Sequence, residues 1–139
     1  MNYRENRIHS SQIKPYSYYQ CIIPDQFAYA PMHWHSEFEI IFVRTGSAEF
    51  TCGEQKFRSA DGDIIVIPPN VMHSVYPCPE MHQIYDTLVF SPELFGSSES
   101  DRCIQECVKP LTTGSMQIQM HITPKHHYYT VMESIVETV

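Results

Sequence analysis

Short apolar and aromatic runs, separated by turn residues, make up the chain between residues 16 and 90. The richest run covers residues 38–45 and stops at Gly46, and the run Ile64–Ile67 is continuously apolar until Pro68 ends it. A short continuous apolar run is typical of a strand that is covered on both faces. Because no long helical period interrupts the series, the pattern predicts a mainly β protein, either a sandwich or a barrel.

Turn signals place further strands in this region. Residues 47–52 and 56–59 flank a turn at Gly53, which predicts a β-hairpin. Two more β-like runs follow, over residues 73–76 and 83–90, and they complete the expected barrel core.

The pattern changes after the barrel core. Residues 91–93 predict a helical turn, and Ser100 is suited to cap a short helix that runs to Val108. Pro110 is expected to stop that helix, because proline lacks the backbone N–H and clashes with the preceding turn. Residues 116–122 alternate again and predict one more strand.

The last segment predicts an amphipathic helix. Thr123 is suited to cap it, and Pro124 fits its first turn. Apolar and aromatic side chains recur at helical spacing, at Tyr128, Val131, Met132, Ile135 and Val139. We expect this stripe to pair with its copy in a homodimer. Neither glycine nor proline ends the pattern, so the helix is expected to continue beyond residue 139.

Composition narrows the class of protein. The 139 residues suit one domain, and 42% hydrophobic with 18% charged residues is typical of a folded chain. Sixteen acidic and nine basic side chains give a formal charge of −7. This is the wrong sign for attraction to DNA phosphates or anionic membranes. This segment is therefore not expected to bind either by itself.

Two further sequence features bear on location. The N-terminus has no apolar run after a basic start, and the longest aliphatic stretch is Ile64–Ile67, so neither a signal peptide nor a membrane span is expected. Five cysteines, an odd number, are scattered without a disulfide pattern. Reduced thiols of this kind indicate a cytoplasmic protein.

The most specific pattern is a set of histidines with one glutamate. His33 and His35 alternate on either side of Trp34, so they point to one face of an extended strand. Glu39 follows shortly after, and His73 comes from beyond the hairpin. Three imidazoles and a carboxylate suit Zn²⁺, Fe²⁺, Mn²⁺, Ni²⁺ or Cu²⁺, and the donors alone do not select the metal.

These residues resemble the two signature motifs of the cupin superfamily. The first, H-x-H-x3-E-x6-G, is matched in full from His33 to Gly46, and the second is matched at Gly62, Pro68 and His73. Asn70 stands where cupins usually have glycine, and Pro77 where they often have asparagine, but these departures leave the ligand positions intact. The resemblance implies a cupin barrel, which is a double-stranded β-helix of jelly-roll type.

The chain is further similar to the N-terminal sensor domains of AraC-type transcription regulators. The similarity lies in residues 38–46, 62–73, 88–95 and 107–111. It implies an effector-binding domain over residues 1–122, with its barrel core at about 16–90, and the start of a dimerisation helix over residues 123–139. It also implies a DNA-binding domain with two helix–turn–helix units beyond Val139.

The leading hypothesis is a sensor without catalytic activity, in which His33, His35, Glu39 and His73 bind a small polar or carboxylated effector, a divalent metal such as Zn, Ni, Fe or Mn, or both. The same four residues are also compatible with a metal-free pocket. The main alternative is a small metal-dependent cupin enzyme, an isomerase or a dioxygenase. A third is a barrel that serves only as a dimerisation scaffold.

Other polar residues are interpreted without a role in the site. Trp34 is expected to face away from the histidines beside it. Asp61 and Asp63 lie next to Gly62 and are interpreted as turn residues rather than as a catalytic pair. The remaining histidines have no partner at ligand spacing and are interpreted as solvated or locally hydrogen-bonded, at His9, His82, His121, His126 and His127.

Overall fold

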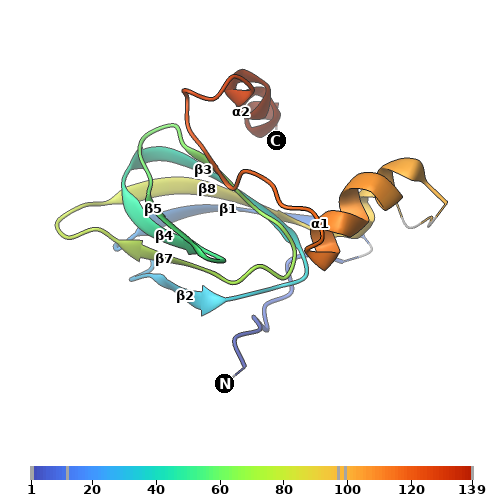
Figure 1. Ribbon diagram of the computed structural model, residues 1–139. Helices are drawn as coiled ribbons and strands as arrows, with labels where there is room; N and C mark the ends of the chain where they lie inside the picture. Colours follow the sequence, from blue (N-terminus) through green and yellow to red (C-terminus); the bar gives the residue numbers. More distant parts are fainter. Residues whose placement is uncertain (1, 12, 97, 99, 139) are drawn as a thin grey trace.

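The computed structural model describes residues 2–11, 13–96, 98 and 100–138. Two antiparallel sheets face each other across the core (Figure 1). One has the strand order β1-β8-β3-β6-β9 and the other β2-β7-β4-β5. The strands are β1 Tyr16–Ile23, β2 Ala30–His33, β3 Phe38–Gly46, β4 Ala48–Cys52, β5 Gln55–Arg58, β6 Ile64–Ile67, β7 His73–Pro77, β8 Gln83–Phe90 and β9 His121–Ile122. The expectation of a mainly β barrel or sandwich is confirmed.

The core lies between the two sheets. Residues of alternate positions on each strand point inward, so β3 contributes Ile41 and Val43, and β6 contributes Ile65 and Ile67. The intervening residues point outward and form separate clusters on the outer face of the five-stranded sheet. The continuously apolar β6 is therefore covered on both faces, as its sequence predicts.

The two predicted turns, at Gly53 and at Gly62, are confirmed, and Gly62 has a φ of +83°. β4 and β5 form a hairpin closed by the pair Cys52 and Gln55, with Gly53 at a φ of +57°. Gly46 has a φ of +93°, and a Cβ there would lie 1.8 Å from the carbonyl oxygen of His82, so no other residue fits without a shift of the backbone. The Asp61 carboxylate accepts a hydrogen bond from the Gly46 N–H at 2.7 Å, which is the structural role expected of it.

The helical segment after the barrel differs from the prediction. A 3₁₀ helix, η1 (Pro92–Phe95), is capped by Ser91 as expected. The next helix is capped by Asp101 rather than Ser100, because the Asp101 carboxylate accepts from the backbone N–H of Cys103 at 2.8 Å. This helix has two parts: a π-helical turn, η2, over Ile104–Val108, and an α-helix, α1, over Lys109–Thr113.

Pro110 does not stop this helix. It lies in the first turn of α1, directly after the wider π-helical turn, where the missing N–H leaves no regular helical bond unmade. The helix instead ends at Gly114, which adopts the left-handed conformation with a φ of +80°.

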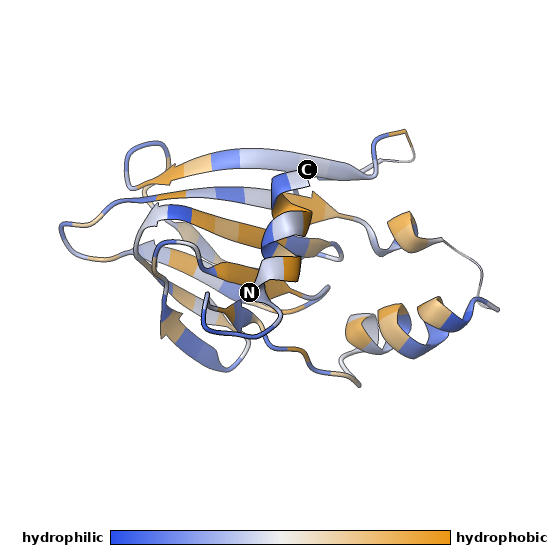
Figure 2. Cartoon of the chain, turned by 90° about the horizontal axis from the view of Figure 1, so that it is seen from above, coloured by the Kyte–Doolittle hydropathy of each residue, from blue (hydrophilic) through white to orange (hydrophobic). Residues whose placement is uncertain are grey.

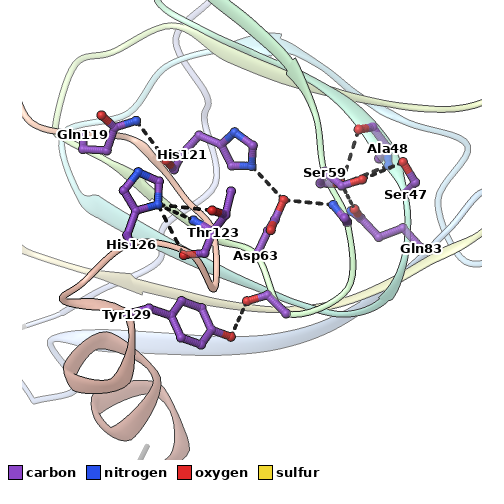
Figure 3. A network of polar contacts seen from close by, with 12 residues as sticks. Ser47, Ala48, Ser59, Asp63, Gln83, Gln119, His121, Thr123, His126 and Tyr129 are labelled. Atoms are coloured by element: carbon purple, nitrogen blue, oxygen red, sulfur yellow. Dashed lines mark hydrogen bonds and ion pairs between the residues drawn. The ribbon is translucent and has the colours of Figure 1, made fainter.

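The last two predicted elements are shorter than expected. In the predicted strand 116–122, only β9 pairs with β6. The final helix, α2 (Tyr129–Thr138), begins six residues after Thr123. The Thr123 N–H donates to Nδ1 of His126 at 2.9 Å, so a side chain holds this segment in a turn and Thr123 does not cap the helix (Figure 3).

Helix α2 lies across the outer face of the five-stranded sheet (Figures 1 and 2). Tyr129, Met132 and Val136 pack against Phe42 and its neighbours on the sheet. The predicted stripe is therefore divided, because Met132 faces the barrel whereas Val131 and Ile135 remain 62% and 47% exposed. Val139 lies outside the described residues. In the described part of the chain, no helix has the length and apolar character needed to cross a membrane.

Candidate ligand and metal site

The structure brings the four predicted residues together at the floor of the barrel interior. His33 ends β2, His73 begins β7, and the two are directly opposite each other in the antiparallel pair. His35 follows β2, and Glu39 projects inward from β3. Their four ligand atoms lie within 4.8 Å of one another. His35, Glu39 and His73 are buried, and His33 is partly exposed.

Backbone carbonyl groups fix the orientation of each imidazole. The Nδ1–H of His33 donates to Pro31 at 2.6 Å, and the Nδ1–H of His73 donates to Val71 at 2.8 Å. The Nδ1–H of His35 likewise donates to the carbonyl oxygen of Glu37, at 3.2 Å. A carbonyl oxygen only accepts, so Nδ1 carries the proton in all three rings and Nε2 is left to bind something else.

Glu39 joins two of these rings. Its Oε2 lies 2.9 Å from Nε2 of His35 and 3.1 Å from Nε2 of His73. Burial alone would raise the pKa of Glu39, but the charges and hydrogen bonds of these imidazoles hold the pKa well below its usual range. The carboxylate is therefore ionised at neutral pH.

The imidazoles respond to their surroundings in opposite directions. Burial would lower the pKa of His35, but the hydrogen bond and charge of Glu39, with the charges of Glu5 and Glu37, raise it above its ordinary value. Burial and the charge of His73 lower the pKa of His33. His33 is thus neutral near pH 7, and among the described residues no group bonds its Nε2, which leaves that lone pair available.

This donor set fits a divalent transition metal. Three Nε2 atoms and one carboxylate oxygen converge, and each imidazole already has the carbonyl partner at Nδ1 that usually accompanies a metal-bound histidine. A metal would compete with protons for the Nε2 atoms of His35 and His73 and for the Glu39 oxygen that lies beside both. The residues present are therefore compatible with the predicted metal.

A cavity of about 700 Å³ opens above the cluster and is lined by three of its members, His33, Glu39 and His73. This volume falls within the range of small-molecule binding sites. The wall formed by the five-stranded sheet presents Ile41, Thr87 and Val89. Aromatic side chains supply much of the remaining lining, at Tyr3, Tyr19, Phe27, Tyr29 and Tyr85.

The rim of the cavity includes a histidine that the sequence did not single out. His9 is only 6% exposed, and its ring centroid lies 5.4 Å from that of His35. Its Nε2–H donates to the Glu5 carboxylate at 2.7 Å, and its Nδ1 accepts from the Tyr19 hydroxyl at 2.9 Å. This segment has no strand or helix periodicity, so no sequence signal places His9 beside the cluster.

The interpretations of Trp34 and His82 hold, whereas that of His121 does not. Trp34 does not line the cavity and lies under the Arg4 guanidinium, with 5.4 Å between the guanidinium carbon and the ring centroid. His82 forms an exposed pair with Asp25. His121 is neither solvated nor locally bonded, because it donates to the buried Asp63 carboxylate, 58 residues away, at 2.7 Å (Figure 3) and stacks on Phe57.

Comparison with known proteins decides the family. The model of the AraC-like ligand-binding domain matches residues 14–111, which include the four clustered residues and most of the barrel. The chain belongs to this family. In a search of curated proteins, no sequence matched the chain.

Solved structures show the fold of this AraC-like domain. A cupin 2 conserved barrel domain protein from Rhodopseudomonas palustris is 15% identical with a TM-score of 0.50, over 60% of this chain and 57% of that protein. A predicted oxalate decarboxylase from Thermotoga maritima is 16% identical with a TM-score of 0.49, over 55% of this chain and 68% of that protein. An RmlC-like cupin with a double-stranded β-helix fold from Methanocaldococcus jannaschii is 14% identical with a TM-score of 0.48, over 59% of this chain and 76% of that protein. The fold is a cupin barrel, and this chain spans just over half of the first of these proteins.

Proposed function

We propose that this domain is the effector-binding and dimerisation part of a cytoplasmic AraC-type transcription regulator and that it catalyses no reaction. A small molecule binds in the cavity and controls DNA binding by a separate C-terminal domain. The observation that carries the proposal is the cavity of about 700 Å³ in a domain of a ligand-binding family, with aromatic walls and with His33, Glu39 and His73 of the four-residue cluster at its floor.

We also propose that His33, His35, Glu39 and His73 hold a divalent metal, one of Zn, Ni, Fe or Mn. Three imidazoles and a carboxylate leave a coordination position open toward the cavity. When bound, such an ion would act as a Lewis acid toward an oxygen or nitrogen atom of the effector. The protein's own contribution is the fixed orientation of the imidazoles by their backbone partners.

Contacts on the outer face of the sheet supply a connection from the cavity to α2. Arg44 on β3 binds the Asp86 carboxylate on β8 at 2.6 Å and the Glu137 carboxylate on α2 at 2.5 Å. The Tyr129 hydroxyl donates to the carbonyl oxygen of Gly62 at 2.5 Å (Figure 3). An effector that favours one arrangement of these strands over another would thereby shift the position of α2.

The proposed dimer uses α2. Val131 is 62% exposed, and Ile135, at the edge of the helix where it also lines a small pocket with Ile40 and Phe42 of the sheet, is 47% exposed. A second copy of the helix would bury these side chains in a two-fold arrangement.

Native and denaturing mass spectrometry of the purified protein, together with elemental analysis, tests this proposal. We expect a dimer that retains a small molecule, a stoichiometric metal, or both. Calorimetric titration with the released molecule should then show weaker binding to the Glu39→Gln variant. Unchanged affinity in Glu39→Gln and in the alanine variants of His35 and His73 would place the effector site elsewhere.

A metal-dependent cupin enzyme is the second candidate, because the ligand set is complete and opens directly into the cavity. Metal-loaded protein should be tested for oxygen uptake and for sugar isomerisation over a panel of acids and monosaccharides. Turnover that the His35→Ala variant lacks would favour the enzyme, whereas stoichiometric binding without turnover favours the sensor.

A further inference from the structure

Arg7 is a cation at the cavity rim without an acidic partner in the described part of the chain. Its guanidinium carbon lies 4.3 Å from the centroid of the Tyr19 ring, and no described carboxylate forms an ion pair with it. The nearest acidic residue in the sequence that also lines the cavity, Glu5, is bound to His9 at 2.7 Å. Arg7 is therefore free to bind an anion from outside the chain.

The ring on which Arg7 stacks is held by a chain of contacts. The Tyr19 ring, on which Arg7 stacks, donates its hydroxyl hydrogen bond to His9. His9 is in turn held by Glu5, and its backbone carbonyl accepts from the Ser17 hydroxyl on β1. A guanidinium that is already oriented loses less conformational entropy when it binds a ligand.

The guanidinium also acts toward the cavity interior. Burial raises the pKa of the Cys21 thiol, and hydrogen bonds to Tyr85 and Thr87, with a smaller effect of the Arg7 charge, act in the opposite direction. Cys21 is two residues after Tyr19 on the same face of β1, and both line the cavity. Arg7 therefore lies over a ring that belongs to the cavity wall.

The acidic residues that line the cavity already have partners: Glu39 is bound by His35 and His73 at the floor, and Glu5 by His9. Arg4, the second arginine of the lining, also has no carboxylate partner among the described residues, but it lies over Trp34, which is not a lining residue, whereas Arg7 lies over Tyr19, which is. Arg7 is therefore the guanidinium held beside the cavity wall, and a planar guanidinium matches a carboxylate through two parallel hydrogen bonds. A phosphate dianion would need more cations or helix N-terminal amides than this rim offers.

We propose that Arg7 binds a carboxylate of the effector, so that the effector is a small organic acid whose body lies between the aromatic walls and extends toward the histidine cluster. This inference rests on the proposed function of the cavity as the effector site. It assigns the chemical class of the effector and the residue that selects it.

Paired probes test this assignment. Phenylacetate, hexanoate and succinate, each with its neutral amide, together with phenyl phosphate and a neutral monosaccharide, are titrated into the wild-type protein and detected by calorimetry and saturation-transfer NMR. We expect at least one acid to bind about tenfold or more tightly than its amide. Arg7→Gln should weaken the binding of that acid about tenfold to hundredfold and leave the binding of the amide unchanged. The affinity of Arg7→Lys for the acid should lie between those of the wild type and Arg7→Gln.

Two control variants separate the possible failures. Arg4→Gln removes a similarly exposed arginine of the same rim and should bind the acid as the wild type does. Ala30→Trp fills the cavity wall and should abolish binding of every probe. Circular dichroism verifies the fold, and Arg7 is exposed, so its substitution leaves the core intact.

The carboxylate assignment is overturned by any of three results: no acid binds, an acid and its amide bind equally, or Arg7→Gln retains the affinity. Tighter binding of phenyl phosphate than of the acids also overturns it. Binding of a neutral probe that Ala30→Trp abolishes would reject the role of Arg7 and still support the cavity as the effector site. Probe binding that Ala30→Trp leaves unchanged would reject both.

Discussion

The inner and outer faces of the five-stranded sheet carry different kinds of residues on the same strands. On β3, Glu39 and Ile41 face the cavity, whereas Ile40 and Phe42 face outward toward α2. The inner face combines a buried charge with a large open volume. The outer face is apolar and is closed by a helix, apart from the ion pairs of Arg44.

This difference shows how one layer of strands can both bind an effector on its inner face and hold α2 on its outer face. Because neighbouring residues of a strand point to opposite faces, a displacement of β3 by a ligand on the inside also displaces the residues that hold α2 on the outside. Substitutions on one face should nevertheless affect mainly the property that belongs to that face. The following predictions test that separation, beginning with the largest expected effect.

Ile135→Asp should act on the outer side alone. A charge in the proposed helix seam has no partner, so we expect the dimer to lose about 3 to 5 kcal/mol and to sediment as a folded monomer. Metal content should remain that of the wild type. Ser134→Asp, an exposed position on another side of α2, is the matched control and should stay dimeric. A dimer that survives Ile135→Asp would direct attention to an edge strand of the barrel.

His35→Ala should act on the inner side alone. Loss of one of four ligands should weaken metal binding by about 100-fold, or ~2.7 kcal/mol, as measured by competition with a chromophoric chelator. His82→Ala removes an exposed histidine with a carboxylate partner and should bind metal normally. Monomer formation by His35→Ala would contradict the separation of the faces, and unchanged affinity would remove His35 from the ligand set.

The pH dependence of stability should change when metal is bound. The pKa of His35 is raised above 6.5, so in metal-free protein its contribution to stability is complete below that pH and is lost as pH rises through the higher pKa. The pKa of Glu39 is lowered from 4.5, so its contribution is present above that pH and is lost only in stronger acid. Metal binding has the opposite trend, because protons compete for Nε2.

Melting temperatures of chelator-treated and zinc-loaded protein between about pH 5.5 and about pH 8.5 measure this change. The lowered pKa of His33 acts against the trend of His35, because a histidine with a lowered pKa costs stability in acid. The decisive result is therefore the difference between the two profiles, in which zinc should make stability fall more steeply toward low pH. Glu5→Gln removes one of the charges that raise the pKa of His35, so it should flatten the metal-free profile. Identical slopes with and without zinc would show that the cluster does not hold the ion.

The barrel and its floor were predictable because short-range patterns encode them. The run Ile64–Ile67 requires cover on both faces, and the turn at Gly53 fixes the register of its hairpin. The spacing of His33, His35 and Glu39 brings three donors together on adjoining inward positions, and only His73 depends on distant pairing. Motif and strand pattern therefore agree on this part of the molecule.

The rim and the helix boundaries were not predictable, because single side chains decide them. His9 reaches the cavity through hydrogen bonds to Glu5 and Tyr19, and neither bond leaves a periodic pattern in the sequence. The His126 ring accepts a hydrogen bond from the N–H of Thr123, so α2 begins later in the chain than predicted. Pro110 lies within a helix because a π-helical turn precedes it. The residue types in that segment do not predict such a turn.

The smallest expected effect concerns the contact that fastens α2 to the turn at Gly62. Tyr129→Phe keeps the ring against Phe42 and Ile64 but removes the hydroxyl that donates to the Gly62 carbonyl at 2.5 Å. Water reaches this partly buried bond, so we expect a loss of about 1 kcal/mol, or roughly 3 to 4 °C in melting temperature. Tyr128→Phe, on the neighbouring helix position, is the control because the described residues offer its hydroxyl no hydrogen bond. An equal loss in both variants would show that ring packing alone holds the helix. A larger loss in Tyr129→Phe, with metal affinity unchanged, would confirm that the outer face is anchored independently of the cavity floor.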